Sequence, residues 1–112
     1  ISSDTFQIPS KLRHLELNRC KINKFDLALP SRLMTCSLID NQLQAQNFSM
    51  SFSAAPSDLK FLDLSSNYFK SFDFDLVSGD GIELSEINFA NNMFEAMPKI
   101  PANILSVILF KK

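Results

Sequence analysis

The chain repeats one pattern of apolar residues five times, and an internal repeat constrains the fold more than any other sequence feature. Each copy fits L-x-x-L-x-L, and the four complete copies continue with x-x-N/C-x-L. Successive first positions are 21, 26, 25 and 20 residues apart. They are Leu12, Leu33, Leu59, Leu84 and Ile104. The repetition predicts one repeat domain over residues 1–112, with one structural unit for each copy.

The prolines keep the same register as the repeats. Pro9, Pro30, Pro56 and Pro101 each stand three residues before the first apolar position of a repeat, and Gly81 takes that place in the fourth. Because proline fixes an extended, non-helical backbone, the chain is expected to return to each new repeat in an extended segment. This second register supports the same division of the chain.

Apolar residues alternate inside each repeat, as Leu15 with Leu17 and Leu62 with Leu64 show. Such alternation predicts a short strand with one buried face. A single repeat cannot bury that face alone, so neighbouring repeats stack and share one core. We therefore predict an α/β-type repeat solenoid. It is an arc with a short parallel concave β-sheet of about five strands and mostly irregular or short helical convex segments.

An asparagine follows the strand in three repeats, at Asn41, Asn67 and Asn92. Its amide can satisfy backbone groups that the bend would otherwise leave unpaired, so the three side chains are expected to form a ladder. Cys20 takes this position in the first repeat and is expected to be a small buried substitute. The 11 phenylalanines are expected to fill the convex side of the core, mainly from segments 48–52 and 69–76.

Composition excludes several classes of function. The chain has 46% hydrophobic and 21% charged residues, as soluble globular proteins do. A net charge of −1 gives no electrostatic basis for binding nucleic acid or an anionic membrane. Two glycines are too few for a phosphate-binding loop. No apolar run approaches the ~20 residues of a membrane span.

The reactive side chains do not form a catalytic or metal-binding set. Cys20 and Cys36 both occupy positions expected to be buried, so inert, reduced thiols are predicted. His14 is the single histidine and is followed by Glu16 on the same strand face, a pair expected to contact a partner rather than to transfer protons. One histidine and two buried thiols cannot make a zinc site. We therefore expect no metal, no cofactor and no enzymatic activity.

Segment 92–109 resembles the N-x-L-x-x-L-P-x-L-P-x-x-L-x-x-L-x-V leucine-rich repeat of secreted bacterial effectors of the IpaH/YopM kind. Segments 29–33 and 8–12 carry the same L/I-P-x-x-L piece, and all spacings fall in the leucine-rich-repeat range. With few Gly and 8 Lys against 3 Arg, the composition is typical of an AT-rich genome such as that of Legionella.

The resemblance implies a non-catalytic scaffold that binds a partner protein through its concave face and inhibits or regulates it. The partner would be a host protein or a bacterial effector enzyme. The resemblance also implies secretion by a bacterium into the reducing host-cell cytosol, without a cleaved signal peptide. Some members add a ubiquitin-ligase domain built around Cys-x-Asp. Cys20 precedes Lys-Ile and Cys36 precedes Ser-Leu, so that activity does not carry over.

Strand alternation predicts which side chains face the partner, because residues flanking the buried ones point to the other face. Phe61 and Ile39 are expected to be apolar anchors, and Glu16, Asp63 and Glu86 to contact basic groups. The predicted partner-binding residues are His14, Glu16, Asn18, Arg19, Thr35, Ile39, Asp40, Phe61, Asp63, Ser65, Glu86, Asn88, Ile108 and Phe110.

The last strand places Ile108 and Phe110 at an end with no visible cap, followed by Lys111 and Lys112. An unpaired apolar edge favours pairing with another chain, so a dimer formed through edge strands is one expectation. Two alternative functions stay open at this point. The chain could be the targeting fragment of a larger secreted effector, or a fragment of an extracellular receptor with a glycan on Asn47.

Overall fold

The computed structural model describes residues 1–53, 56–77 and 81–109. Phe110, expected at the partner-binding surface, lies outside these residues, as do Lys111 and Lys112. The elements are short strands joined by long irregular segments and two 3-10 turns. In chain order they are β1 (His14–Glu16), β2 (Phe25–Leu29), β3 (Thr35–Ser37), η1 (Ala45–Asn47), β4 (Phe48–Phe52), β5 (Phe61–Asp63), η2 (Phe74–Leu76), β6 (Glu86–Asn88) and β7 (Ser106–Ile108).

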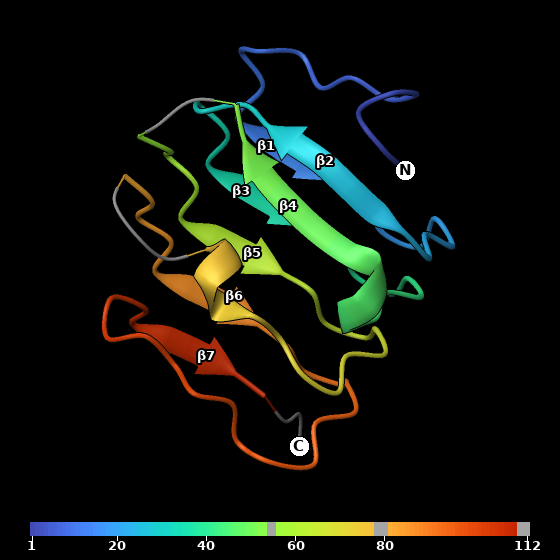
Figure 1. Ribbon diagram of the computed structural model, residues 1–112, viewed down its shortest axis with the longest axis vertical. Coiled ribbons are helices and arrows are strands. Elements are labelled where there is room, and N and C mark those ends of the chain that lie inside the picture. Colours follow the sequence, from blue (N-terminus) through green and yellow to red (C-terminus); the bar gives the residue numbers. More distant parts are fainter. Residues whose placement is uncertain (54–55, 78–80, 110–112) are drawn as a thin grey trace.

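Five strands form one parallel sheet in the order β1-β3-β5-β6-β7, as the repeat predicted. Their pairing is in register, so one repeat position forms a row across the sheet. The middle row is Leu15, Cys36, Leu62, Ile87 and Val107. Figure 1 shows the strands stacked in sequence order, with the N-terminal repeat at one end and the C-terminal repeat at the other. We call the outer face of this sheet the concave face.

A second sheet covers part of the opposite side and was not expected. Strands β2 and β4 pair in parallel and lie in front of the larger sheet in Figure 1. Apolar residues alternate in both, so Phe25, Leu27 and Leu29 pack inward beside Phe48 and Met50. The described convex segments are otherwise irregular apart from the short turns η1 and η2, so the predicted fold is confirmed, and the pairing of β2 with β4 is an addition to it. In the third repeat η2 takes the place of the strand.

The core lies between these two layers and is rich in phenylalanine on the convex side. Phe89 is fully buried and its ring lies 4.9–6.2 Å, centroid to centroid, from those of Phe69, Phe72, Phe74 and Phe94. These pairs adopt edge-to-face geometry, which aromatic rings prefer. The expectation that the phenylalanines fill the convex core is confirmed.

The asparagine ladder is present as predicted. Asn67 is 2% exposed, and its Nδ2 donates to the backbone oxygens of Leu38 and Leu64 at 2.9 and 3.1 Å. Its Oδ1 accepts from the backbone N–H of Leu43 at 3.0 Å. Asn41 and Asn92 repeat this pattern one repeat earlier and one later. The ladder thus joins consecutive turns through groups that the bend leaves unpaired.

The bend also needs a left-handed backbone, and the residue before each ladder position supplies it. Arg19, Asp40, Ser66 and Asn91 all have φ between 56° and 59°, although none is glycine. Left-handed backbone is unfavourable for residues that carry a Cβ. The same bend in four repeats therefore depends on the ladder and the stacked core to hold it.

Cys20 is exposed, so the prediction that it would be buried at the ladder position was wrong. Ladder amides of later repeats donate to a carbonyl of the preceding turn, and within the described residues no such turn precedes the first repeat. Its thiol instead donates to the backbone oxygen of Asn18 at 3.2 Å. Asn41, from the next repeat, accepts from the backbone N–H groups of Cys20 and Ile22, each at 3.0 Å. The amide of the second repeat thereby stabilises the turn of the first.

Candidate protein-binding surface

Three rows of side chains cross the concave face, because the parallel strands pair in register. The first row holds His14, Thr35, Phe61, Glu86 and Ser106. The second row holds Glu16, Ser37, Asp63, Asn88 and Ile108. The third follows the strands and holds Asn18, Ile39, Ser65 and Ala90. All predicted partner-binding residues that the structure describes lie in these three rows, except Arg19 and Asp40. These two lie beside the rows, at the turn.

Exposure divides the predicted residues into three groups. The exposed group is His14, Glu16, Arg19, Asp40, Glu86 and Ile108. The half-buried group is Asn18, Thr35, Ile39, Phe61 and Asn88. Asp63 and Ser65 are only 8% and 9% exposed, so the prediction that both stand out from the sheet was wrong. Asp63 is the last residue of the central strand β5, and Ser65 follows that strand by two residues.

Hydrogen bonds between repeats hold several polar side chains of this face in place. The Oδ1 atom of Asn18 accepts from the Ser37 hydroxyl and from the backbone N–H of Ile39, both at 2.8 Å. The Nδ1 atom of His14 lies 2.8 Å from the Thr35 hydroxyl oxygen. A surface fixed in this way loses little side-chain entropy when a partner binds.

The charge on the rows is of one sign. Glu16, Asp63 and Glu86 are carboxylates, and the rows contain no Lys or Arg among the residues that the structure describes. Arg19 and Asp40 form an ion pair with 3.7 Å between nitrogen and oxygen, but both side chains are exposed, and such pairs contribute little stability. The concave face is therefore acidic although the chain as a whole is almost neutral.

The thiol under this face is chemically inert. Cys36 lies at the centre of β3 and points into the core, and burial raises the pKa of its thiol to about 12 from an ordinary value of 9.0. A thiol that stays protonated at neutral pH is neither a nucleophile nor a metal ligand. Residues 1–53, 56–77 and 81–109 contain no cluster of three His, Cys, Asp or Glu side chains suited to a metal ion.

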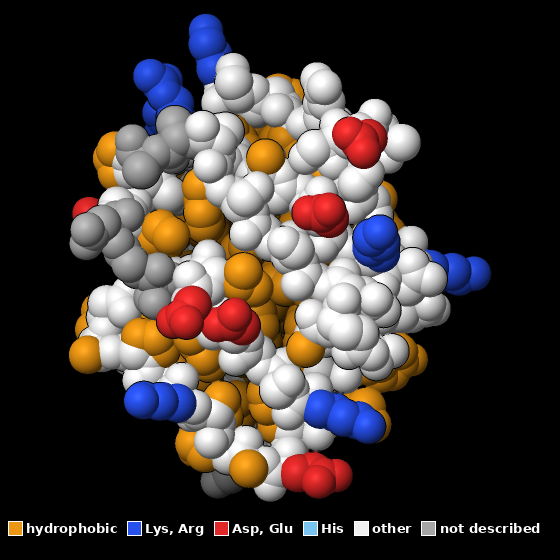
Figure 2. Space-filling model, in the orientation of Figure 1, with side chains coloured by type: hydrophobic (Ala, Val, Ile, Leu, Met, Phe, Trp, Pro, Cys, Tyr) orange, Lys and Arg blue, Asp and Glu red, His pale blue; other side chains and the backbone are white. Residues whose placement is uncertain are grey.

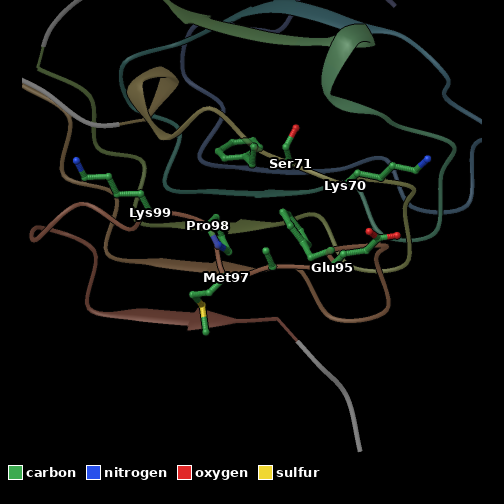
Figure 3. Close-up of a pocket in the computed structure, with 9 residues that line it drawn as sticks. Lys70, Ser71, Glu95, Met97, Pro98 and Lys99 are labelled. Atoms are coloured by element: carbon green, nitrogen blue, oxygen red, sulfur yellow. The ribbon is translucent and has the colours of Figure 1, made fainter.

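The structure has a groove on the convex side that was not predicted from the sequence. It encloses about 490 Å³ between segments 70–72 and 94–99, and Phe72 and Phe94 contribute to its lining. Figure 2 shows hydrophobic side chains in the middle of this side, with charged groups of both signs around them. In Figure 3, Met97 and Pro98 lie between Lys99 and Lys70, which stand at opposite ends. The signal in the sequence was the pair of prolines at 98 and 101, which hold the last return segment extended.

The convex groove is a weaker candidate than the concave face. Its lysines are accompanied by Glu95, and the adjoining hollow adds Asp73 and Asp75, so the groove presents no consistent charge. Its walls are irregular segments, whereas the concave rows stand on paired strands. Binding sites built on rigid elements hold their geometry better than sites on loops.

The stacked turns, the in-register sheet and the asparagine ladder define a parallel β-solenoid with one strand for each repeat on its concave side. The Leucine Rich Repeat family model matches residues 58–79, which contain β5, the ladder residue Asn67 and η2. The chain thus contains a leucine-rich repeat at residues 58–79 and has a fold consistent with a leucine-rich-repeat arc, and such domains generally bind other proteins. No curated protein and no solved structure matches it. Within the described residues no helix is long and apolar enough to cross a membrane.

Proposed function

We propose that this chain is a non-catalytic binding module that holds a partner protein against its concave face. The observation that supports this proposal is the position of Phe61, half-buried on the central strand and next to Glu86 in the same row. Ile39 adds a second half-buried apolar side chain in the third row. Apolar groups near the centre of a polar, acidic surface are typical of interface hot spots.

The size of the face limits how the module acts. Five strands at ~4.8 Å spacing give a sheet about 20 Å across, enough for roughly 600–800 Å² of interface on each side. An interface of this size covers an enzyme's active site or a docking site but does not enclose a large protein. We therefore propose that binding acts by occlusion, so that the partner is inhibited or regulated.

The setting that we propose is the reducing cytosol of a host cell, after secretion by a bacterium. Two observations support it: the resemblance of segment 92–109 to repeats of secreted effectors, and two cysteines that form no disulfide. The partner is then a host protein or another bacterial effector enzyme. A secretion assay with the tagged chain in the producing bacterium tests this setting, and retention of the chain in the bacterium would contradict it.

Affinity capture from host and bacterial lysates tests the binding role when wild type is compared with Phe61→Ala. Each captured protein is purified and its affinity measured by calorimetry. We expect the phenylalanine truncation to weaken binding by at least tenfold, since hot-spot truncations typically cost about 2 kcal/mol or more. Leu105→Ala is the matched control, because Leu105 is 84% exposed and precedes the last strand. Equal affinity of wild type and Phe61→Ala would exclude this site.

A further inference from the structure

Asp63 and Asn88 occupy the same position in consecutive repeats and perform the same structural task. The Oδ1 atom of Asp63 accepts from the backbone N–H of Ser65 at 3.0 Å. The Oδ1 atom of Asn88 accepts from the backbone N–H of Ala90 at 2.9 Å. The fold thus needs one acceptor oxygen at this position, and a neutral amide supplies it.

The negative charge of Asp63 is therefore not required by its structural task. A carboxylate that is 8% exposed has lost most of its hydration, which is unfavourable unless another group compensates for it. Among the described residues, neither ion pair involves Asp63, and its only side-chain hydrogen bond uses Oδ1. No fully buried side-chain N or O atom there lacks a partner, so Oδ2 reaches solvent at the concave face. The second oxygen is thus available to a donor from outside.

Two neighbours of Asp63 complete a small cation-binding arrangement. Phe61 precedes it by two residues on the same face, so their Cα atoms are about 6.6 Å apart along the strand. Glu86 stands beside Phe61 in the register of the adjacent strand, about 4.8 Å away between backbones. One half-buried aromatic ring is thereby flanked by two carboxylates from two strands. The nearest lysine along the chain, Lys60, is paired with Glu83 at 3.1 Å.

We propose that Phe61, Asp63 and Glu86 form a subsite for an arginine side chain of the partner. This inference depends on the proposed use of the concave face. A guanidinium group stacks on an aromatic ring and donates to carboxylates from the edge of the same plane, which matches the ring and the two carboxylates found here. Lysine carries a compact charge with no plane to stack, so it fits this arrangement less well. The partner segment is accordingly basic, with arginine opposite β5.

The subsite is tested by titrating the ¹⁵N-labelled chain with N-acetylarginine methylamide and recording amide chemical shifts. We expect saturable shifts at residues 61–65 and 86–90, with a dissociation constant on the order of millimolar for a single side chain. Asp63→Asn should weaken this binding about tenfold, because one charged hydrogen bond is lost while the bond to Ser65 is kept. Glu86→Gln should act in the same direction, and Asp26→Asn on the convex sheet is the control with the same charge change.

Three results would overturn the subsite: no saturable shift near residues 61–65, equal binding by wild type and Asp63→Asn, or equal binding of the lysine analogue. The spectrum of Asp63→Asn also reports whether the variant is folded. None of these three results contradicts the proposed function if capture of a partner protein still depends on Phe61. Loss of the Phe61 dependence with arginine binding intact would instead reject the concave face as the protein-binding site.

Discussion

Asn67 offers the sharpest test of how this solenoid is held together. Its amide donates to the backbone oxygens of Leu38, Leu64 and Ser65 and accepts from the backbone N–H of Leu43. The oxygens of Leu38 and Leu64 also accept from the ladder amides of Asn41 and Asn92. Asn67→Ala therefore leaves the backbone oxygens of Leu38 and Leu64 with one ladder amide each as donor. It leaves the buried N–H of Leu43 with no partner.

The expected loss of stability in Asn67→Ala follows from these lost hydrogen bonds. A buried N–H without a partner costs about 1–3 kcal/mol, and the lost bonds to carbonyls that keep another donor add about 1 kcal/mol. Because Asn67 is 2% exposed, water has little access to the vacated space. We expect a loss of about 2–4 kcal/mol, a large part of the total stability of about 5–15 kcal/mol for a domain of this size.

Urea unfolding followed by circular dichroism measures this loss, with Asn47→Ala as control because the Asn47 side chain is exposed. The control should change the free energy of unfolding by less than about 0.5 kcal/mol. If Asn67→Ala lowers the free energy of unfolding by less than about 1 kcal/mol, the asparagine ladder does not contribute substantially to stability.

Asn67→Asp extends the test through its pH dependence. The carboxylate keeps the acceptor for the N–H of Leu43 but turns its other oxygen toward three carbonyl oxygens, which favours the protonated form and raises the pKa in the folded state. The folded state then binds more protons than the unfolded state. Stability is therefore retained in acid and lost as the pH rises above about 3.9, until the folded-state pKa is passed. Stability of this variant that increases with pH over that range would contradict the argument.

The remaining predictions concern the thiols, the aromatic core and a surface ion pair. In the folded protein a thiol reagent at neutral pH should modify Cys20 alone, because Cys36 is buried, and mass spectrometry after digestion identifies the site. Since burial raises the pKa of Cys36 to about 12 from 9.0, stability should be retained below pH 9 and fall above it, by about 2 kcal/mol at pH 10.5. That fall should be absent in Cys36→Ala when the two urea transitions are compared across pH. Phe89→Ala removes a fully buried ring and should cost about 3–5 kcal/mol in calorimetry, and a loss below about 2 kcal/mol would contradict the assigned packing. Arg19→Ala should change stability by less than about 0.5 kcal/mol, because its pair with Asp40 is exposed.

The acidic concave face gives the proposed partner a recognisable chemistry. A basic segment is attracted to Glu16, Asp63 and Glu86, and this attraction weakens as salt screens the exposed carboxylates. Association should therefore slow with ionic strength, while the apolar contact at Phe61 persists. A partner whose association rate is insensitive to salt would be recognised by shape and apolar contact alone.

The sequence by itself determined the repeat, the parallel sheet, the asparagine ladder and the phenylalanine-rich core. Each of these depends on spacing along the chain: Leu15 and Leu62 recur at fixed positions, and Asn67 follows its strand at a fixed distance. Stacking then brings equivalent positions together, so a local pattern is enough to specify which residues meet in the core. The same logic correctly placed the described residues of the predicted binding set on one face or at its edge.

Only the tertiary structure decided how individual side chains are buried and which segments pair on the convex side. Asp63 is buried and Cys20 exposed because burial depends on the neighbouring repeats, and within the described residues only the short segment before β1 lies on the N-terminal side of the first repeat. Strands β2 and β4 pair because two return segments of similar pattern lie side by side, while the third return turns at η2. Such lateral contacts depend on packing between repeats. Alternation within one repeat therefore predicts which face of the sheet a side chain points to, but not how exposed the side chain is or which residues it contacts.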